Sequence, residues 1–344
     1  MLFTTNGMII LDDIHTSSGE HYSDVVGGAG TYAILGSCIV RDGLSGWIVD
    51  RGSDFPNKIT KEIEHWNSGA IFRDSTNRLT TRGANFYGEN DLRQFKYLTP
   101  KRQITVLDWI NCYGVTNVNS IKCIHLVCSP ERVQEILEAL SQIRNDNLMV
   151  PTFIWEPLPD SMIVENYDTI KQILDRHENI IISPNCEEGA RLFGMKEPRD
   201  IVQCRALLCK FTDYMKPENS CVLRCGKMGS MILSPKTDDG TRESSHFPAY
   251  HLLTPDKVVD PTGGGNSFLG GFGLAYALTK DFQISNLCGT ISAGCNIEQI
   301  GVAQFDSISK KINNTLTFKE RVEHYIKLYN LPLSVDDIYS KLYK

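Results

Sequence analysis

The stretch Asp260-Pro261-Thr262-Gly263-Gly264-Gly265-Asn266 places three consecutive glycines in front of an apolar run with helical spacing. We predict a glycine loop that leads into a helix, with the β-branched pair Val258-Val259 ending a strand before the loop. Glycine adopts positive φ readily and lets a ligand approach closely, and a helix N-terminus presents unpaired N–H groups to an anion. A tight turn with a helix cap explains the glycines alone equally well, but the flanking residues favour an anion site.

Composition and charge narrow the range of functions. The chain has 344 residues and a net charge of −6, so it can form one large α/β domain or two smaller ones. The charges are mixed and form no basic run, so we expect no direct nucleic-acid binding and no membrane partner. No apolar run reaches membrane-spanning length. Eleven cysteines without a C-x-x-C pair are typical of reduced thiols, which predicts a cytoplasmic or nuclear protein and makes a zinc site the less favoured use of them.

Predicted strands alternate with predicted helices along most of the chain. Strands are expected at residues 124–127, 151–155, 180–183 and 221–223. The first is followed by a helix with Ser129 as its N-cap and Pro130 at its first position. This alternation predicts an α/β fold with a mostly parallel central sheet and helices on both faces. We expect a single domain over residues 1–344 that ends in a helical extension at 306–344 with a capping box at Thr317–Glu320.

The N-terminal part is predicted to hold the first strand and a small β lid. Phe3–Ile14 has the composition of one buried strand whose carboxyl end carries Asp12, at the edge where open α/β sheets bind ligands. A strand-end turn accounts for the acid equally well. Lid strands are expected within about 14–28 and 76–98, the second as a hairpin that turns at Arg82-Gly83.

The glycine stretch resembles the second signature of the PfkB (ribokinase-like) family of sugar and nucleoside kinases, which reads roughly D-T-x-G-A-G-D. The resemblance implies a ribokinase-like fold in which Gly263, Gly264 and Gly265 form the anion hole for the transferred phosphate. It also implies that the last position holds the base that accepts the proton of the substrate hydroxyl. That position is Asn266 here, and an amide is not a usable base near neutral pH.

Two further N-terminal segments are similar to motifs of the same family. Gly7 and Asp12 have the spacing of its first strand, G-x-x-x-x-D, and the residues from Gly27 resemble its first signature, G-G-x-G-x-N. The resemblance implies that Asp12, Gly27 and Gly28 bind the substrate. Tyr32 replaces the Asn of this motif, which contacts the sugar in the family, so the usual contact with the sugar is not expected.

Two segments of the second half resemble the family's phosphate and nucleotide motifs. Asn185 and Glu188 fit P-N-x-x-E, whose Glu organises Mg²⁺ and phosphate through water, although acids in the first turn of an ordinary helix give the same pattern. Gly226 and Gly229 fit the turn T-x-G-x-x-G that touches the nucleotide, with Arg224 where Thr is usual.

A helix expected at Leu287–Gln299 consists mostly of small residues, Asn296 among them. The resemblance implies that this helix lines the adenine pocket, while tight helix packing explains the small residues equally well. In another strand, Glu156-Pro157 departs mildly from the family's Asp-Pro. The implied cofactors are ATP and Mg²⁺.

Two functions remain open at this stage. One is a kinase that transfers phosphate from Mg-ATP to a sugar or nucleoside and survives the loss of its base, or uses Asp12 or Asp13 instead. The other is a pseudokinase that keeps the fold as a binding or scaffold protein, because Asn266 and Tyr32 are independent departures. The wording of the glycine stretch is most similar to a fungal branch, the maintenance-of-killer proteins, linked to the stability of particles that contain viral double-stranded RNA. Since the acidic composition does not favour RNA contact, such a role would run through protein partners.

Overall fold

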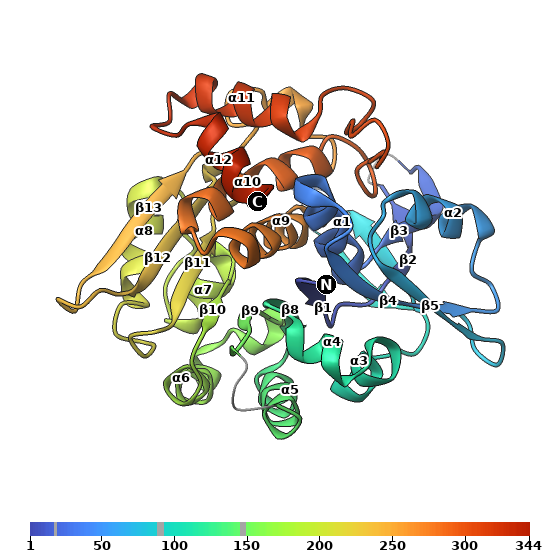
Figure 1. Cartoon of the computed structure of the whole chain (residues 1–344), viewed down its shortest axis with the longest axis horizontal. Coiled ribbons are helices and arrows are strands. Elements are labelled where there is room, and N and C mark those ends of the chain that lie inside the picture. Colours follow the sequence, from blue (N-terminus) through green and yellow to red (C-terminus); the bar gives the residue numbers. More distant parts are fainter. Residues whose placement is uncertain (17–18, 88–92, 145–148) are drawn as a thin grey trace.

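A computed structural model describes residues 1–16, 19–87, 93–144 and 149–344. A nine-stranded sheet runs through the middle of the molecule in the order β13-β12-β11-β10-β9-β8-β1-β4-β5 (Figure 1). All pairings are parallel except those of β12 with β11 and with β13. The strands are β1 (Phe3–Thr5), β4 (Ser45–Gly52), β5 (Ala70–Ser75), β8 (Cys123–Cys128), β9 (Thr152–Pro157), β10 (Ile180–Ile182), β11 (Ser220–Arg224), β12 (Ser230–Lys236) and β13 (Arg242–Phe247).

Helices cover both faces of this sheet, and each face has its own buried apolar cluster. One cluster contains side chains of α1 (Ala29–Arg41), α2 (Asn57–His65), α9 (Gly264–Thr279), α10 (Phe282–Asn296), α11 (Phe318–Tyr329) and α12 (Val335–Leu342). The other contains side chains of α3 (Val106–Tyr113), α4 (Val115–Ser120), α5 (Pro130–Gln142), α6 (Tyr167–Arg176), α7 (Cys186–Leu192) and α8 (Ile201–Lys210). The predicted α/β fold with helices on both faces is confirmed.

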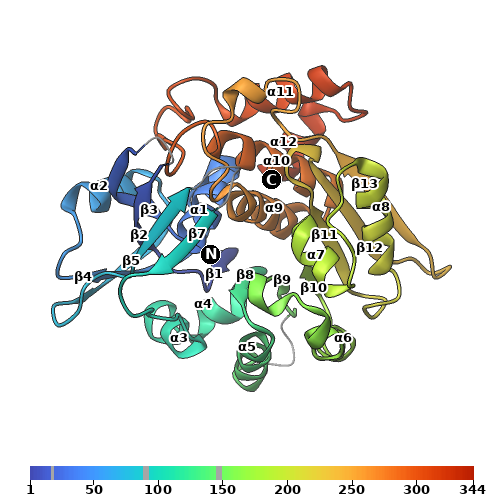
Figure 2. The same ribbon diagram turned by 180° about the vertical axis from the view of Figure 1, so that it is seen from behind.

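Four strands form a second, smaller sheet beside β4 and β5, seen from behind in Figure 2. Its order is β3-β2-β6-β7, with β2 (Ile10–His15), β3 (His21–Gly27), β6 (Arg82–Tyr87) and β7 (Arg93–Tyr97). The expected hairpin at Arg82-Gly83 is wrong, because both residues lie inside β6 and pair with β2. Residues 88–92, between β6 and β7, and residues 17 and 18 of the first lid segment lie outside the described residues.

Two other strand predictions are wrong. Phe3–Ile14 is two strands, since the chain leaves the central sheet after Thr5 and enters the lid at Ile10. Asp12 therefore lies within a lid strand and not at the carboxyl end of a core strand. Val258-Val259 forms no strand either; the Val259 N–H bonds the Ile297 carbonyl 2.8 Å away, which ties the glycine loop to the end of α10.

Local signals fix the ends of several helices as predicted. Ser129 caps α5 by accepting from the Arg132 N–H, and Thr317 forms a capping box with Glu320 at the start of α11. Helix α9 begins at Gly264, after Gly263 in the left-handed conformation with φ of 73°. A Cβ on Gly270 would overlap the carbonyl of Ala33, so α9 needs glycine there to pack closely on α1.

Candidate functional site

The three glycines of the loop lie directly against side chains of the same chain. A Cβ on Gly263 would overlap the ring of Tyr32, and a Cβ on Gly265 would overlap the guanidinium of Arg224. On Gly264 it would lie 2.8 Å from Ile297 Cγ2. Close approach by the protein itself therefore requires these glycines, whether or not an anion binds the first N–H groups of α9.

Arg224 ends β11 and lies between two buried carboxylates. Its Nη1 is 2.8 Å from Glu156 Oε1, and its Nη2 is 3.4 Å from Glu188 Oε2. Nη2 also donates to the Ser183 carbonyl at 3.0 Å. The backbone of Arg224 pairs with Asn185 in an isolated parallel bridge, which brings the start of α7 beside the end of β11. One guanidinium thus links the carboxyl ends of β9, β10 and β11, the edge where α/β sheets bind ligands.

Asn266 is held by the first of these carboxylates. Its Nδ2 donates to Glu156 Oε2 at 2.6 Å, and the same oxygen lies 3.1 Å from Nε2 of the buried His125. Nδ1 of His125 is 3.0 Å from the hydroxyl of Thr5. Because a charged carboxylate only accepts, Nε2 carries the proton. The base position of the family motif is therefore an amide in α9 that donates a hydrogen bond to a carboxylate on β9.

The two carboxylates respond to their surroundings in opposite ways. Burial raises the pKa of Glu156, but the charge of Arg224 and the hydrogen bond from His125 outweigh it and leave the pKa lowered. Burial also raises the pKa of Glu188, and here the more distant contact with Arg224 does not reverse the effect. Glu188 accepts from the Asn185 N–H at 2.8 Å while Asn185 Oδ1 accepts from the Glu188 N–H at 2.8 Å. Asn185 and Glu188 thus form the cap of α7, as the simpler sequence interpretation had it.

These residues fit a magnesium site only in part. Mg²⁺ prefers oxygen ligands and keeps several waters, and Glu156 and Glu188 supply two carboxylates close together. Both are engaged by Arg224, so a cation would have to displace the guanidinium from at least one of them.

The predicted substrate residues come together at the lid. Asp12 is 5% exposed, a Cβ on Gly27 would overlap its Oδ2, and a Cβ on Gly83 would lie 2.9 Å from its Oδ1. Gly28 has φ of 92° and caps α1. Burial, and after it the charge of Asp12, raises the pKa of Tyr97 on lid strand β7.

A cavity of about 150 Å³ opens beside these residues. It lies between the loop after β1, the start of α1, β7 and the start of α5, and its lining includes Asn6, Gly7, Ala29, Tyr97 and Lys101. The Gly7 N–H donates to Thr5 Oγ1 at 2.9 Å, and Thr5 in turn contacts His125. A chain of hydrogen bonds therefore connects the edge of this cavity to Glu156.

The predicted nucleotide residues are divided between two environments. Gly226 and Gly229 shape the turn between β11 and β12 with φ of 55° and 93°, and a Cβ on Gly226 would meet no atom within 4 Å. That turn has an open side. Asn296 instead is fully buried, and its Nδ2 donates to the Thr262 carbonyl at 2.9 Å. Asn296 positions the glycine loop from behind.

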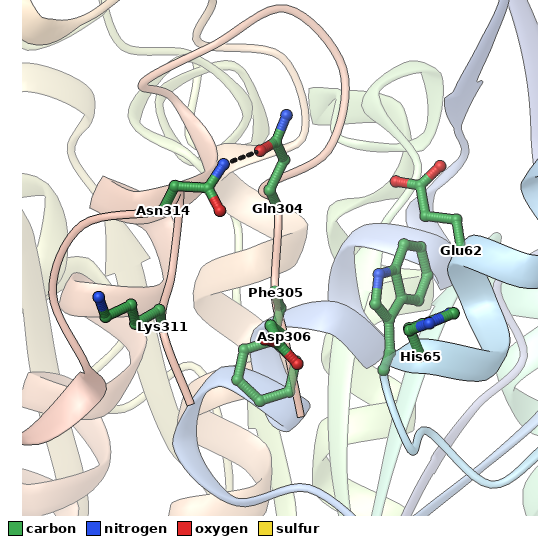
Figure 3. A pocket seen from close by; sticks show the side chains of 8 residues that line it. Glu62, His65, Gln304, Phe305, Asp306, Lys311 and Asn314 are labelled. Carbon is green, nitrogen blue, oxygen red and sulfur yellow. Dashed lines mark hydrogen bonds between the residues drawn. The ribbon is translucent and has the colours of Figure 1, made fainter. Parts of the chain in front are cut away.

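A second cavity, of about 380 Å³, lies elsewhere (Figure 3). Glu62 and His65 of α2 line one side, and residues of the segment after α10 line the other, where Asn314 Nδ2 donates to Gln304 Oε1 at 2.8 Å. None of the residues that the motifs single out lines it. The convergence of polar groups at Arg224 identifies the candidate site better than cavity size does.

The sequence missed most of the network around Arg224. Glu156 was noted only as a departure from Asp, and His125 and Thr5 carried no signal. Position gave a clue only for Glu156, which directly follows the strand predicted at 151–155. Thr5 ends β1 in the structure but lay near the start of the predicted strand Phe3–Ile14. No helix among the described residues is long and apolar enough to cross a membrane.

Sequence comparison with known proteins finds relatives over most of the chain. The sequence model of the pfkB family of carbohydrate kinases matches residues 80–308. Protein MAK32 of Saccharomyces cerevisiae is 46% identical over 351 residues, which cover 99% of this chain and 96% of that protein. An uncharacterised protein of Schizosaccharomyces pombe is 30% identical, with 94% of this chain and 92% of that protein covered.

Solved structures show the same fold at low sequence identity. Ribokinase from Giardia lamblia superimposes with a TM-score of 0.68 and 16% identity, over 95% of this chain and 98% of that one. Ribokinase from Thermotoga maritima gives a TM-score of 0.59 and 19% identity, over 95% and 99%. The predicted ribokinase-like fold is confirmed.

Proposed function

Because this chain belongs to the pfkB carbohydrate kinase family, we propose that it keeps binding sites for Mg-ATP and a hydroxylated substrate but transfers phosphate slowly or not at all. One observation carries the proposal. At the position where the family has a base, the Asn266 amide donates a hydrogen bond to Glu156. Loss of a general base costs roughly 10²–10⁴-fold in rate, which is about 3–5 kcal/mol of barrier. The ligand class, a sugar or a nucleoside, follows from the family.

Arg224 has a double role in this proposal. In the free protein it neutralises Glu156 and Glu188. When a nucleotide binds between the turn at Gly226 and the start of α9, the guanidinium pairs with phosphate oxygens and releases the carboxylates. Bound Mg²⁺ would neutralise phosphate charge, and Glu188 with Asn185 would orient its waters. Asp12 would accept hydrogen bonds from substrate hydroxyls, with Gly27 and Gly28 giving room for close approach.

If transfer is slow rather than lost, Glu156 is the candidate base, because its Oε2 lies only 2.6 Å from Asn266 Nδ2. The Glu156 carboxylate is thus one hydrogen bond away from the usual base position. The lowered pKa of Glu156 makes it a weak base, which fits slow turnover. Asp12 and Asp13 are further candidates for the base. If Asp12 is the base, Asp12→Asn abolishes turnover; if Asp13 is the base, Asp13→Asn does.

The test separates binding from chemistry. Calorimetry with Mg-ATP measures binding by the purified protein, and ADP release against a panel of sugars and nucleosides measures turnover. Asn266→Asp restores the family base but sets two carboxylates side by side, so their titrations would couple. Asn266→Asp combined with Glu156→Gln removes that conflict, and Glu156→Gln alone is the matched control.

Each outcome selects one function. Turnover only in variants with Asn266→Asp supports an intact site that lacks its base. Clear turnover by the unaltered protein that Glu156→Gln abolishes establishes slow transfer with Glu156 as the base. Turnover by the unaltered protein as fast as in the variants with Asn266→Asp overturns the proposal. If no variant binds nucleotide or turns over, a scaffold role through protein partners remains, as the resemblance to the maintenance-of-killer branch implies. The eleven free thiols support a reducing compartment such as the cytoplasm or nucleus for either role.

A further inference from the structure

Three cysteines from separate segments meet on the side of the sheet covered by α7 and α8. Cys186 is the first residue of α7, Cys204 lies in α8, and Cys225 follows β11. All three are buried, and their Sγ atoms lie within 4.8 Å of one another. The thiols of Cys186 and Cys204 are 3.5 Å apart. The thioether of Met228 adds a fourth sulfur, 3.8 Å from Cys204 Sγ.

This arrangement differs from that of the other cysteines. In the part of the chain that the structure describes, it is the only group of three Cys, His, Asp or Glu residues whose ligand atoms come this close together. A buried thiol on its own behaves as a small apolar group and needs no ligand. Here four sulfur atoms from three segments lie together, and a helix or turn fixes the backbone of each segment. They can therefore act as a preformed set of metal ligands.

The chemistry of the set selects the metal. All four atoms are sulfur, and thiolates with a thioether suit Cu(I) better than Mg²⁺ or Ca²⁺, while Zn²⁺ is usually bound with four Cys or His ligands. Metal–sulfur bonds of about 2.3 Å place neighbouring sulfurs about 3.7–4.0 Å apart. The observed separations of 3.5 and 3.8 Å are close to this range. Small side-chain shifts would therefore complete the site.

We propose that Cys186, Cys204 and Cys225 bind one soft monovalent cation, Cu(I), with Met228 as an additional ligand. Each thiol that coordinates releases its proton to solvent, so binding strengthens as pH rises. The bound ion would tie α7, α8 and the turn at Gly226 together. This site uses no ATP, so its presence does not depend on the function proposed above.

The experiment is an anaerobic titration of the reduced full-length protein with Cu(I) against a chromogenic Cu(I) chelator. We expect one equivalent to bind, with an ultraviolet thiolate-to-metal band. Cys186→Ser and Cys225→Ser should each weaken binding about 100-fold, and Met228→Leu less. Cys221→Ser, four residues before Cys225 and also buried, and Cys209→Ser, on α8 but exposed, are the controls and should bind as the unaltered protein does.

Several results would overturn the proposal. One is that the unaltered protein binds Cu(I) no better than the Cys186 and Cys225 variants do. Another is that the control variants lose as much Cu(I) binding as these two variants. A third is that Zn²⁺ saturates the protein under conditions where Cu(I) does not bind. Formation of a Cys186–Cys204 disulfide with hydrogen peroxide, with no Cu(I) bound before oxidation, would identify a redox pair instead. Circular dichroism of each variant, with Cys→Ala versions of the two site changes, separates lost binding from lost folding.

Discussion

Arg321 and Arg224 both form ion pairs with carboxylates, but Arg321 pairs with one partner, the partly exposed Glu298, and Arg224 with two buried ones. Both nitrogens at the end of Arg321 contact Glu298, at 2.6 and 2.9 Å, and the side chain is 3% exposed. Glu298 also accepts from Asn313 at 2.6 Å and lies 3.3 Å from His251. This cluster joins α11 to the segment after α10.

Arg224 gives each of its carboxylates a single contact, at 2.8 Å to Glu156 and 3.4 Å to Glu188. Its side chain is 13% exposed, so water reaches part of it. The pKa values reflect the same difference. Burial opposes the effect, but hydrogen bonds from His251 and Arg321 lower the pKa of Glu298 to about 2, whereas burial leaves the pKa of Glu188 raised.

The comparison separates a structural cluster from a functional one. At Glu298 every charge is matched by partners that hold it in place, which is typical of a cluster that stabilises the fold. Around Arg224 two carboxylates share one guanidinium. The remaining negative charge can bind another cation, or an anion can bind Arg224 in place of one of the carboxylates. Two neighbouring carboxylates whose pKa values are shifted in opposite directions, at the ligand-binding edge of a sheet, are candidates for function.

The strongest test of this contrast is Arg321→Met, which leaves Glu298 without its main partner. We expect the free energy of unfolding to fall by about 3 kcal/mol, at the lower end for a pair largely removed from water, because the Glu298 side chain is 19% exposed. Urea unfolding measures it. Arg51→Met is the matched control: its pair with Asp74 is largely exposed, so its loss should change stability far less. Equal losses in both variants would contradict the structural role of Arg321.

Acid titration tests the same cluster through Glu298. A carboxyl whose folded pKa is depressed adds stability above its unfolded value, and this stability is lost as pH falls from about 4.5 toward about 2. Between pH 6 and pH 3 the unaltered protein should lose about 2 kcal/mol that Glu298→Gln does not lose. The measurement is the free energy of unfolding at each pH. Parallel pH profiles for the two proteins would show that Glu298 is not the group responsible.

Much of the fold could be predicted because its signals are local. The glycines before α9, the Ser129 cap and the Thr317 capping box each lie within a few residues of the structure they specify. The first strand was misjudged for the same reason. An apolar run such as Phe3–Ile14 looks alike whether it stays in one sheet or passes to another, and only the packing of the lid decides.

The two arginine clusters could not be predicted because their partners are distant in sequence. Asn266 and Glu156 are 110 residues apart, and His125 and Glu156 are 31 apart. The motif at Asn266 indicated which group was missing but not which group now contacts it. The three clustered cysteines were equally hidden, since 18 residues separate Cys186 from Cys204 and no metal motif has that form.

Arg224→Thr, which restores the family residue, should affect stability less than Arg321→Met but ligand binding more. We expect a loss of about 1–2 kcal/mol, because the pair is partly solvated and Glu188 can take up a proton. Because the guanidinium is proposed to pair with phosphate oxygens, the rise in melting temperature expected with Mg-ATP should be smaller in this variant. Arg191→Thr is the control: Arg191 lies in α7, pairs with Glu187 at 3.8 Å and donates to the Pro159 carbonyl. An equal or larger rise in Arg224→Thr would mean that the guanidinium does not hold the phosphates.

The smallest effect is expected for Glu188→Gln, within about 0.5 kcal/mol at pH 7 in urea unfolding. The raised pKa means that folding already disfavours the charge of Glu188, and a glutamine oxygen still accepts from the Asn185 N–H. The pH dependence has the opposite sign to that of Glu298. A carboxyl with a raised folded pKa weakens the fold while ionised, and this cost is relieved as pH falls through that pKa.

The unaltered protein should therefore gain stability over Glu188→Gln on acidification, while it loses stability relative to Glu298→Gln. If Glu188→Gln instead cost several kcal/mol at pH 7, Arg224 and Glu188 would form a second structural cluster. The carboxylates at the end of the sheet would then be committed to holding α7 in place, and a cation there would have to compete with the fold itself.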